Sequence, residues 1–149
     1  MSAPTPTPVP PTPIPLVVLD ASVWISSVLS QDVNHALANN WLQVHISNRG
    51  RLVAPMILVV ETAAALSRLT GDPMVAHNGI GYLHSFTPMS LVPLEQALVD
   101  ESANTAADLG LRAGDAMYVA LAKRLGLPLV TFDRDQLIKA ARIISTVRP

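Results

Sequence analysis

Two aspartates each end a short apolar run, and the two runs lie far apart in the chain. Asp20 closes the stretch "PLVVLD" and Asp133 closes the stretch "PLVTFD". Such runs are typical of strands buried in a parallel sheet, and ligands bind where the carboxyl ends of parallel strands meet. If the two strands are neighbours, their backbones lie about 5 Å apart and the carboxylates converge. Converging carboxylates repel one another, and a divalent cation that prefers oxygen ligands would relieve that repulsion.

Helix capping is the alternative explanation for both aspartates. Asp20 could cap the helix that follows it, but Ser22 is the better candidate for that cap and leaves the Asp20 carboxylate free. Asp133 is followed three residues later by Gln136, which resembles a capping box, so capping remains an open explanation there. Asp135 is an ordinary acid of a first helical turn, and we expect it to be peripheral.

Two further acids are notable for their surroundings. Glu61 is the only charged residue between Arg51 and Arg68. Its neighbours at helical spacing are all apolar, namely Ile57, Leu58, Ala64 and Ala65. A lone buried carboxylate is costly, so we expect Glu61 to point into a cleft. Asp115 lies in the first turn of a predicted helix, where the helix dipole favours a negative charge, so its position alone does not indicate a site.

The composition limits the class of protein. The chain has 149 residues, which predicts one domain large enough to hold a real core. Half of the residues are hydrophobic and only 14% are charged, which excludes a chain that is disordered throughout. There are no cysteines, so disulfides, thiolate catalysis and cysteine-based zinc sites are excluded. The four histidines show no spacing typical of a metal site.

The charges are distributed unevenly. Residues 1–110 carry three basic and eight acidic residues, whereas residues 111–149 carry seven basic and three acidic ones. The basic C-terminal part could face phosphate groups, or it could consist of solvated charges at helix ends. No apolar stretch approaches the roughly 20 residues of a membrane span, and the first basic residue is Arg49, which argues against a signal peptide. These features predict a soluble, cytoplasmic protein.

Short strands alternate with helices along most of the chain. Residues 1–15 form a Pro/Thr-rich segment that we expect to be polyproline-like or disordered, and residues 16–149 form the folded domain. The strands are expected at residues 16–19, 51–54, 90–94, 127–132 and 143–147. The helices are expected at residues 22–30, 32–47, 55–70, 72–86, 95–110, 112–126 and 133–142. This alternation indicates an α/β fold with a mainly parallel central sheet.

Individual residues are expected to mark the helix ends. Ser22 and Asp32 are expected to cap the first two helices, and Pro55 to open the third as its first residue. Glycines stop three of the helices, at Gly71, Gly110 and Gly126.

The acids follow the order strand end, mid-helix, helix start, strand end. In this order, and in the stretches "VVLDASVWI", "ILVVETAAAL" and "LRAGDAMYVALAKRLGLPLVTFD", the chain resembles the PIN-domain ribonucleases, most closely the VapC-type toxins of prokaryotic toxin–antitoxin pairs. The resemblance covers roughly residues 16–147. It implies a PIN-like fold with helices on both faces of the sheet and an acidic pocket at the strand ends. The acids of that pocket fall on Asp20, Glu61, Asp115 and Asp133, and Ser22 falls on a small hydroxyl position.

The resemblance also implies an activity and partners. The expected activity is hydrolysis of RNA phosphodiester bonds with Mg²⁺, for which Mn²⁺ could substitute. Asp20 and Asp115 would be the principal metal ligands, while Glu61 and Asp133 would complete the shell. Members of this type are usually homodimers, and a small antitoxin protein holds them inactive. Two arginines near the acids in sequence could contact RNA phosphates or be ordinary surface cations, namely Arg112 and Arg134.

A binding module of the same fold that has lost catalysis is the competing hypothesis. The presence of all four acids argues against it. Two other phosphate-handling classes lack their signatures here. A haloacid-type phosphatase needs a second Asp where Ser22 stands, and a receiver-type domain needs an acidic pair where Val18 and Leu19 stand.

Overall fold

The computed structural model describes residues 15–149. The Pro/Thr-rich segment predicted over residues 1–15 lies outside the described part, except for Pro15. The carbonyl oxygen of Pro15 accepts a hydrogen bond of 2.8 Å from the backbone nitrogen of Arg51. Within residues 15–149, no helix is both long and apolar enough to cross a membrane.

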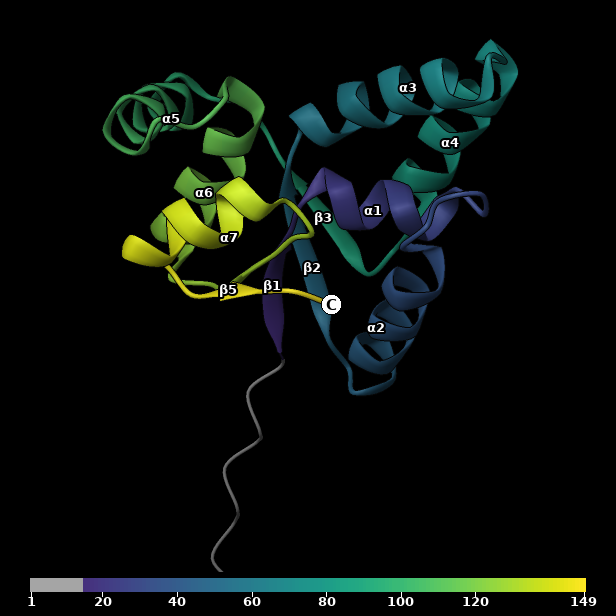
Figure 1. The fold of residues 1–149 in the computed structure, drawn as a ribbon, viewed down its shortest axis with the longest axis horizontal. Coiled ribbons are helices and arrows are strands. Elements are labelled where there is room, and N and C mark those ends of the chain that lie inside the picture. Colours follow the sequence, from purple (N-terminus) through teal and green to yellow (C-terminus); the bar gives the residue numbers. More distant parts are fainter. Residues whose placement is uncertain (1–14) are drawn as a thin grey trace, which may run out of the picture.

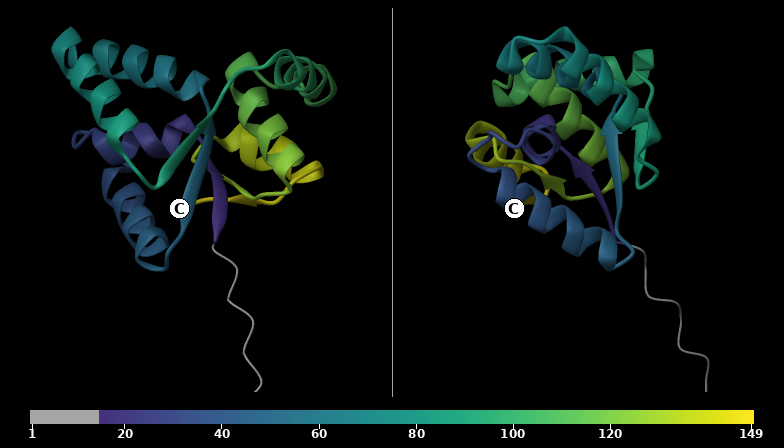
Figure 2. Two further views of the ribbon diagram at one scale, coloured as in Figure 1. Left: turned by 180° about the vertical axis from the view of Figure 1, so that it is seen from behind. Right: turned by 90° about the vertical axis from the view of Figure 1, so that its right-hand side faces the viewer.

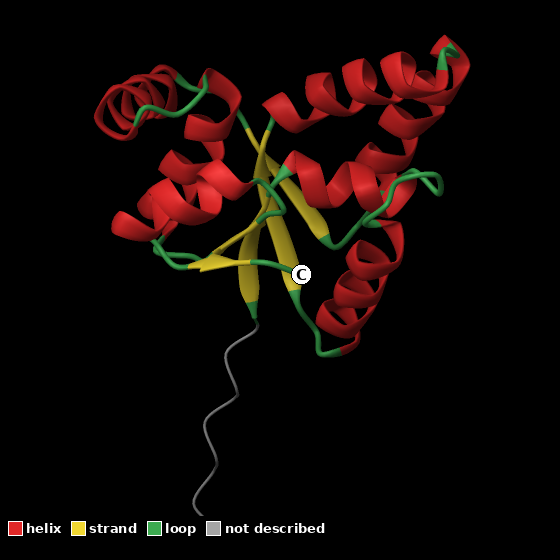
Figure 3. Cartoon of the chain, in the orientation of Figure 1, coloured by secondary structure: helices red, strands yellow, loops and turns green. Residues whose placement is uncertain are grey.

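A five-stranded sheet runs through the centre of the molecule (Figures 1 and 3). Its strands are β1 (Leu16–Leu19), β2 (Arg51–Pro55), β3 (Met89–Val92), β4 (Leu129–Val130) and β5 (Thr146–Val147). Their order is β3-β2-β1-β4-β5, and every neighbouring pair is parallel. The first strand therefore lies beside the fourth, with Leu19 opposite Val130. The strands before Asp20 and Asp133 are therefore neighbours, which meets the condition under which their carboxylates converge.

Helices lie on both faces of this sheet (Figures 1 and 2). They are α1 (Ala21–Val28), α2 (His35–Ser47), α3 (Ile57–Thr70), α4 (Pro73–Ser85), α5 (Gln96–Leu109), α6 (Ala113–Leu125) and α7 (Arg134–Lys139), followed by a 3₁₀ turn (Ala140–Arg142). The helices α3 and α4 pack together as an antiparallel arm, and α5 packs on α6, which in turn contacts β1 and β2. The predicted α/β architecture is thus confirmed.

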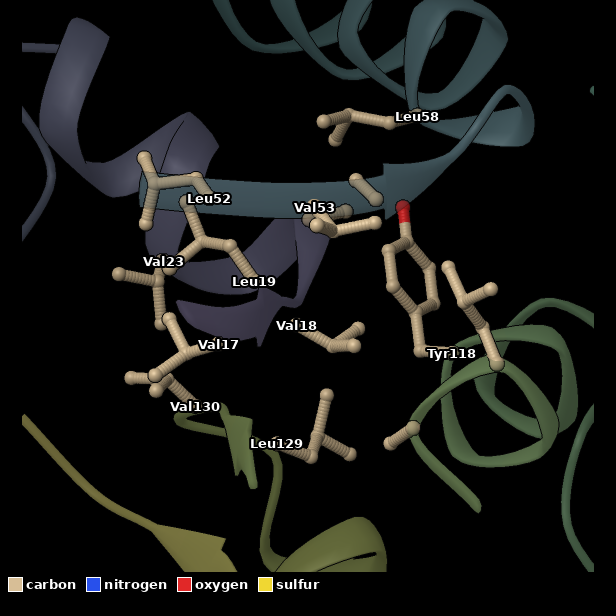
Figure 4. Packing of buried hydrophobic residues seen from close by; sticks show 14 of the residues in the cluster. Val17, Val18, Leu19, Val23, Leu52, Val53, Leu58, Tyr118, Leu129 and Val130 are labelled. Atoms are coloured by element: carbon tan, nitrogen blue, oxygen red, sulfur yellow. The ribbon is translucent and has the colours of Figure 1, made fainter. Parts of the chain in front are cut away.

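The core is built from the apolar strand residues and the inner faces of the helices. Val18, Leu19 and Leu129 are fully buried, and each such side chain stabilises the fold by about 1.5–3 kcal/mol through removal of apolar surface from water. Tyr118 of α6 belongs to the same cluster, and its hydroxyl group points toward the place where β2 ends and α3 begins (Figure 4). This orientation brings one polar atom from the core to the carboxyl edge of the sheet.

Three predicted helix starts are wrong. Asp20, not Ser22, is the N-cap of α1, because its carboxylate accepts the backbone hydrogen of Ser22. Asp32 forms a tight turn by accepting from the backbone nitrogen of Asn34 at 2.7 Å, and α2 begins only after that turn. Pro55 is the last residue of β2, opposite Val92, so α3 starts two residues later.

The predicted stops are correct. Gly71, Gly110 and Gly126 each follow a helix in the left-handed conformation, which glycine adopts without steric cost.

Candidate active site

Asp20 is the most deeply buried acid of the predicted site. It follows β1 directly, and its side chain is only 4% exposed. One carboxylate oxygen, Oδ2, accepts from the Ser22 backbone and from the Thr131 hydroxyl, both at 3.0 Å. The other oxygen, Oδ1, accepts from the amide of Gln136 at 3.0 Å. Capping and site formation are therefore not alternatives for this residue, because one carboxylate serves in both.

Hydroxyl groups join the two strand ends. The Ser22 hydroxyl accepts the backbone hydrogen of Phe132 at 3.0 Å and lies 3.3 Å from the Thr131 hydroxyl. Thr131 donates to Asp20 and accepts from the backbone nitrogen of Asp133 at 2.9 Å. Ser22 thus lies in the site, where it holds the end of β4 rather than the start of α1.

Gln136 connects three of the four acids. Its side-chain nitrogen donates to Asp20 Oδ1 at 3.0 Å and to Asp115 Oδ1 at 2.9 Å. Its backbone nitrogen donates to Asp133 Oδ1 at 2.9 Å, which is one half of the predicted capping box. The reciprocal half is absent, because the backbone nitrogen of Asp133 pairs with Thr131 instead. The side chain is fully buried, and its oxygen Oε1 has no hydrogen-bond partner among the described residues.

Arg112 lies on the rim and bridges two acids. Its guanidinium donates to Asp115 Oδ2 and to Asp133 Oδ2, both at 2.9 Å, while its own side chain remains 77% exposed. The acids and their donors thereby form one continuous series, in which each carboxylate is linked to the next by an N–H donor. The series is defined as Asp20–Gln136–Asp115–Arg112–Asp133.

Glu61 reaches the same region from α3. The Tyr118 hydroxyl donates to Glu61 Oε2 at 2.5 Å. The other oxygen, Oε1, lies so close to α6 that a β-carbon added at Gly114 would approach it to 2.7 Å. Glu61 is therefore half-buried against α6.

Burial sets the ionisation of this cluster. Removal from water raises the pKa of Asp20 above its usual value, although the hydrogen bonds from Ser22, Gln136 and Thr131 oppose that rise. Burial also raises the pKa of Glu61, and the negative charges of Asp20 and Asp115 raise it further, while Tyr118 opposes them. The surroundings of Asp20 and Glu61 thus disfavour their negative charges, and a nearby cation would stabilise those charges.

The structure thus brings all four predicted acids and Ser22 to one edge of the sheet, with Arg112 beside them. Arg134 opens α7 nearby and is exposed, but it forms no ion pair within the described part of the chain. Among residues 15–149, no three histidine or acidic side chains form a ready-made cage for a metal ion. The N–H groups of Gln136 and Arg112 lie between the carboxylates instead.

Three site residues were not predicted from the sequence as members of the site: Thr131, Gln136 and Tyr118. Thr131 lies two residues before Asp133, and its hydroxyl accepts from the backbone nitrogen of that residue. Tyr118 lies three residues after Asp115 and shares its helix face. Gln136 was noted only as a capping partner, and its burial depends on how α7 packs.

The chain belongs to the PIN domain family, because the model of that family matches residues 17–143. The search of curated proteins returned no match. The structure of VapC20 from Mycobacterium tuberculosis, described as a sarcin–ricin loop cleaving toxin, superposes with a TM-score of 0.73 at 18% identity, covering 89% of this chain and 99% of that one.

Two further solved structures share the fold. VapBC2 from Rickettsia felis, bound to a fragment of its promoter DNA, matches with a TM-score of 0.67 at 12% identity, over 89% of this chain and 98% of that one. A toxin–antitoxin complex from Klebsiella pneumoniae matches with a TM-score of 0.63 at 16% identity, over 88% and 95%. The predicted membership of the PIN family, with the fold of VapC-type toxins, is confirmed.

Proposed function

We propose that this chain is a metal-dependent endoribonuclease that acts as the toxin of a toxin–antitoxin pair. The observation that carries the proposal is the convergence of four carboxylates from β1, α3, α6 and the end of β4. Two of them, Asp20 and Asp115, share one amide nitrogen as a hydrogen-bond donor. Because an acidic cluster of this kind needs a countercharge, a role in cation binding explains it better than a structural role.

The donor set fits a hard divalent cation. It consists of carboxylate oxygens, which suit Mg²⁺ with Mn²⁺ as a substitute. Asp20 and Asp115 would hold the cation, and Glu61 and Asp133 would complete the shell directly or through water. When bound, such a cation supplies an activated water and neutralises charge on the reacting phosphate.

The remaining residues have distinct tasks in hydrolysis. Glu61 is suited to orient the attacking water, because it is only partly buried and its pKa is raised in the direction of neutral pH. Tyr118 holds the Glu61 carboxylate in place through its hydroxyl group. Arg112 and Arg134 are both exposed, and in this proposal they would contact phosphates of the RNA.

RNA is the proposed substrate, and an antitoxin protein is the proposed partner. VapC20 carries the description of a sarcin–ricin loop cleaving toxin, and other structures with this fold are complexes with antitoxins. An apolar groove of about 570 Å³ lies between α1, α2 and α4, and Trp24, Leu42 and Tyr82 are among its lining residues. Such a groove suits an apolar segment of an antitoxin. We also propose that this chain forms a homodimer, as VapC-type toxins usually do.

Cleavage of RNA by acid variants is the direct test. Single- and double-stranded RNA are incubated with the parent protein in Mg²⁺, in Mn²⁺ and in EDTA. Asp20→Asn and Asp115→Asn should each reduce cleavage by at least about 100-fold, because each removes a charge that the cation needs. Asp135→Asn is the matched control, since Asp135 is exposed and pairs only with Lys139. If the two site variants cleave as fast as the parent, the assignment is wrong.

The groove can be tested separately from catalysis. Co-expression of the cognate antitoxin, expected to be a small protein encoded by an adjoining gene, should suppress RNA cleavage by this chain. Val75→Asp puts a charge into the groove at a partly exposed position, so it should restore cleavage in the presence of that protein and leave cleavage alone in its absence. If the antitoxin still suppressed RNA cleavage by Val75→Asp, it would bind at a surface other than this groove.

A further inference from the structure

The buried amide of Gln136 has an unusual set of contacts. Both acceptors of its nitrogen are carboxylate oxygens of the proposed metal ligands Asp20 and Asp115, whereas its own oxygen has no partner among the described residues. An amide nitrogen carries two hydrogens, so each of them can serve one carboxylate. Gln136 therefore gives the two acids a shared, partly positive contact in the absence of any cation.

Packing alone does not account for this side chain. A buried polar atom without a hydrogen-bond partner destabilises a fold, and the oxygen Oε1 of Gln136 is in that position within residues 15–149. A methionine or leucine would fill similar space without that cost. The hydrogen bonds that the side-chain nitrogen donates to Asp20 and Asp115 offset the cost of the unpaired oxygen. Without them, the two carboxylates would face one another.

The same nitrogen occupies the place between the two acids. A cation bound by both carboxylates needs their oxygens to approach a common point at about 2.1 Å. The Gln136 nitrogen already lies 3.0 and 2.9 Å from one oxygen of each. The cation and the amide hydrogens therefore compete for the same two oxygens.

We propose that Gln136 is a positioning residue whose amide takes the place of the cation between Asp20 and Asp115 in the metal-free protein. The amide holds the two carboxylates close to one another through its hydrogen bonds. At least one of these hydrogen bonds must break when a cation binds to both carboxylates. Gln136 thus sets the cation affinity of the site by competition. This inference rests on the proposed function, because it takes the two acids to be the metal ligands.

The test compares Mn²⁺ binding by the full chain and by Gln136→Met, measured by calorimetric titration and by the melting temperature with and without Mn²⁺. Methionine keeps the volume and removes both N–H donors. The Mn²⁺ dissociation constant should fall about tenfold, which is the change expected when one competing hydrogen bond to a charged group is removed. The rise in melting temperature on adding Mn²⁺ should be larger than in the parent. Gln96→Met, at an exposed position of α5, is the matched control and should leave both quantities unchanged.

Each other outcome decides against the inference. If Gln136→Met bound Mn²⁺ with unchanged affinity, Gln136 would have only a packing role. If it bound Mn²⁺ more weakly than the parent, Gln136 would stabilise the bound cation instead of competing with it. The inference would also be overturned if Gln136→Met failed to fold even in saturating Mn²⁺. If Gln136→Met folded only when Mn²⁺ is present, the inference would be supported, because the cation would then replace the missing amide between the two acids. If the parent takes up no Mn²⁺ that Asp20→Asn abolishes, the proposed function falls and this inference with it. If the parent takes up Mn²⁺ that Asp20→Asn abolishes, but Gln136→Met binds Mn²⁺ as the parent does, the proposed function stands and the inference alone fails.

Discussion

The Tyr118 hydroxyl donates a hydrogen bond of 2.5 Å to Glu61, which joins the buried face of α6 to α3. Tyr118 is almost completely buried, and burial raises the pKa of its hydroxyl far above the usual value, so the group remains a donor at any pH of interest. Glu61 is a half-buried carboxylate whose pKa is raised mainly by loss of water and also by the charges of Asp20 and Asp115. Tyr118 opposes that rise and therefore favours the ionised form of Glu61.

Tyr118→Phe should separate this effect from packing. The ring is kept, but the hydrogen bond to Glu61 is removed, so the pKa of Glu61 should rise further and the acid limb of the cleavage pH profile should move upward. The free energy of unfolding should fall by about 1–3 kcal/mol. Tyr82→Phe is the control, because Tyr82 is half exposed on α4 and its ring stacking with Trp24 survives the change. An acid limb that moves equally in both variants, or in neither, would contradict the role given to Tyr118.

Gly114 leaves room for Glu61, and filling that room should impair activity more than stability. A β-carbon at this position would lie 2.7 Å from Glu61 Oε1, so Gly114→Ala must displace the carboxylate. Alanine favours the helix by about 0.5–1 kcal/mol, and the displaced group is the movable end of a side chain, so the free energy of unfolding should change little. Cleavage should fall by about tenfold or more, because displacement of a catalytic group by about 1 Å is costly.

Gly81→Ala is the matched control for that experiment. Gly81 is exposed on α4, and nothing lies within 4 Å of the added carbon. It should gain the helix-forming benefit of about 0.5–1 kcal/mol with unchanged cleavage. Equal cleavage by the two variants would show that the contact between Gly114 and Glu61 does not matter.

The mainly parallel α/β fold and the convergence of the acids could be predicted, but the order of the strands and the links between the acids could not. Apolar runs and glycine stops depend on local sequence, and these features located every strand and most helix ends. The pairing of Gln136 with Asp20 and Asp115 depends instead on how α7 packs against two elements that are distant in sequence. No spacing rule relates residues 116 and 21 positions apart.

The wrong helix starts have a related cause. A Ser after an Asp looks like the better cap when each residue is judged alone. The Ser22 hydroxyl, however, accepts from the backbone of Phe132 at the end of β4. The Ser22 hydroxyl is therefore engaged in a tertiary hydrogen bond, and Asp20 is the residue that caps α1.

Arg112 should contribute to RNA binding without contributing much to stability. Its ion pairs with Asp115 and Asp133 lie at the surface, where such pairs are worth about 0–1 kcal/mol. Arg112→Ala is measured in the Asp20→Asn background, so that RNA is bound without being cut. Affinity for single-stranded RNA should fall, and the slope of log K against log salt should weaken by about 0.7, because one phosphate fewer is neutralised by the protein. Arg68→Ala, which removes the same charge at the far end of α3, is the control. Indistinguishable slopes for the two variants would assign Arg112 to charge balance of the acids alone.

The buried Asp20 carboxylate should make the cation-free protein less stable as the pH rises. Burial raises its pKa in the folded chain above the usual 3.8, so the folded state binds the proton more tightly than the unfolded state does. The free energy of unfolding should therefore decrease as the pH rises from about 4 through the folded pKa, and the contribution of Asp20 should be constant above it. Asp20→Asn removes this contribution and keeps a side chain that can still cap α1.

Urea unfolding in EDTA between about pH 4 and pH 8 measures the effect as a difference between Asp20→Asn and the parent. That difference should grow in favour of the variant as the pH rises, because only the parent acquires a buried charge. Saturating Mn²⁺ should reverse the order at neutral pH, since the parent alone can bind it at Asp20. The exposed Asp135→Asn should remain within about 0.5 kcal/mol of the parent at every pH. A difference that stays constant with pH would mean that the folded chain does not resist ionisation of Asp20, and the cation would then have no buried charge to neutralise there.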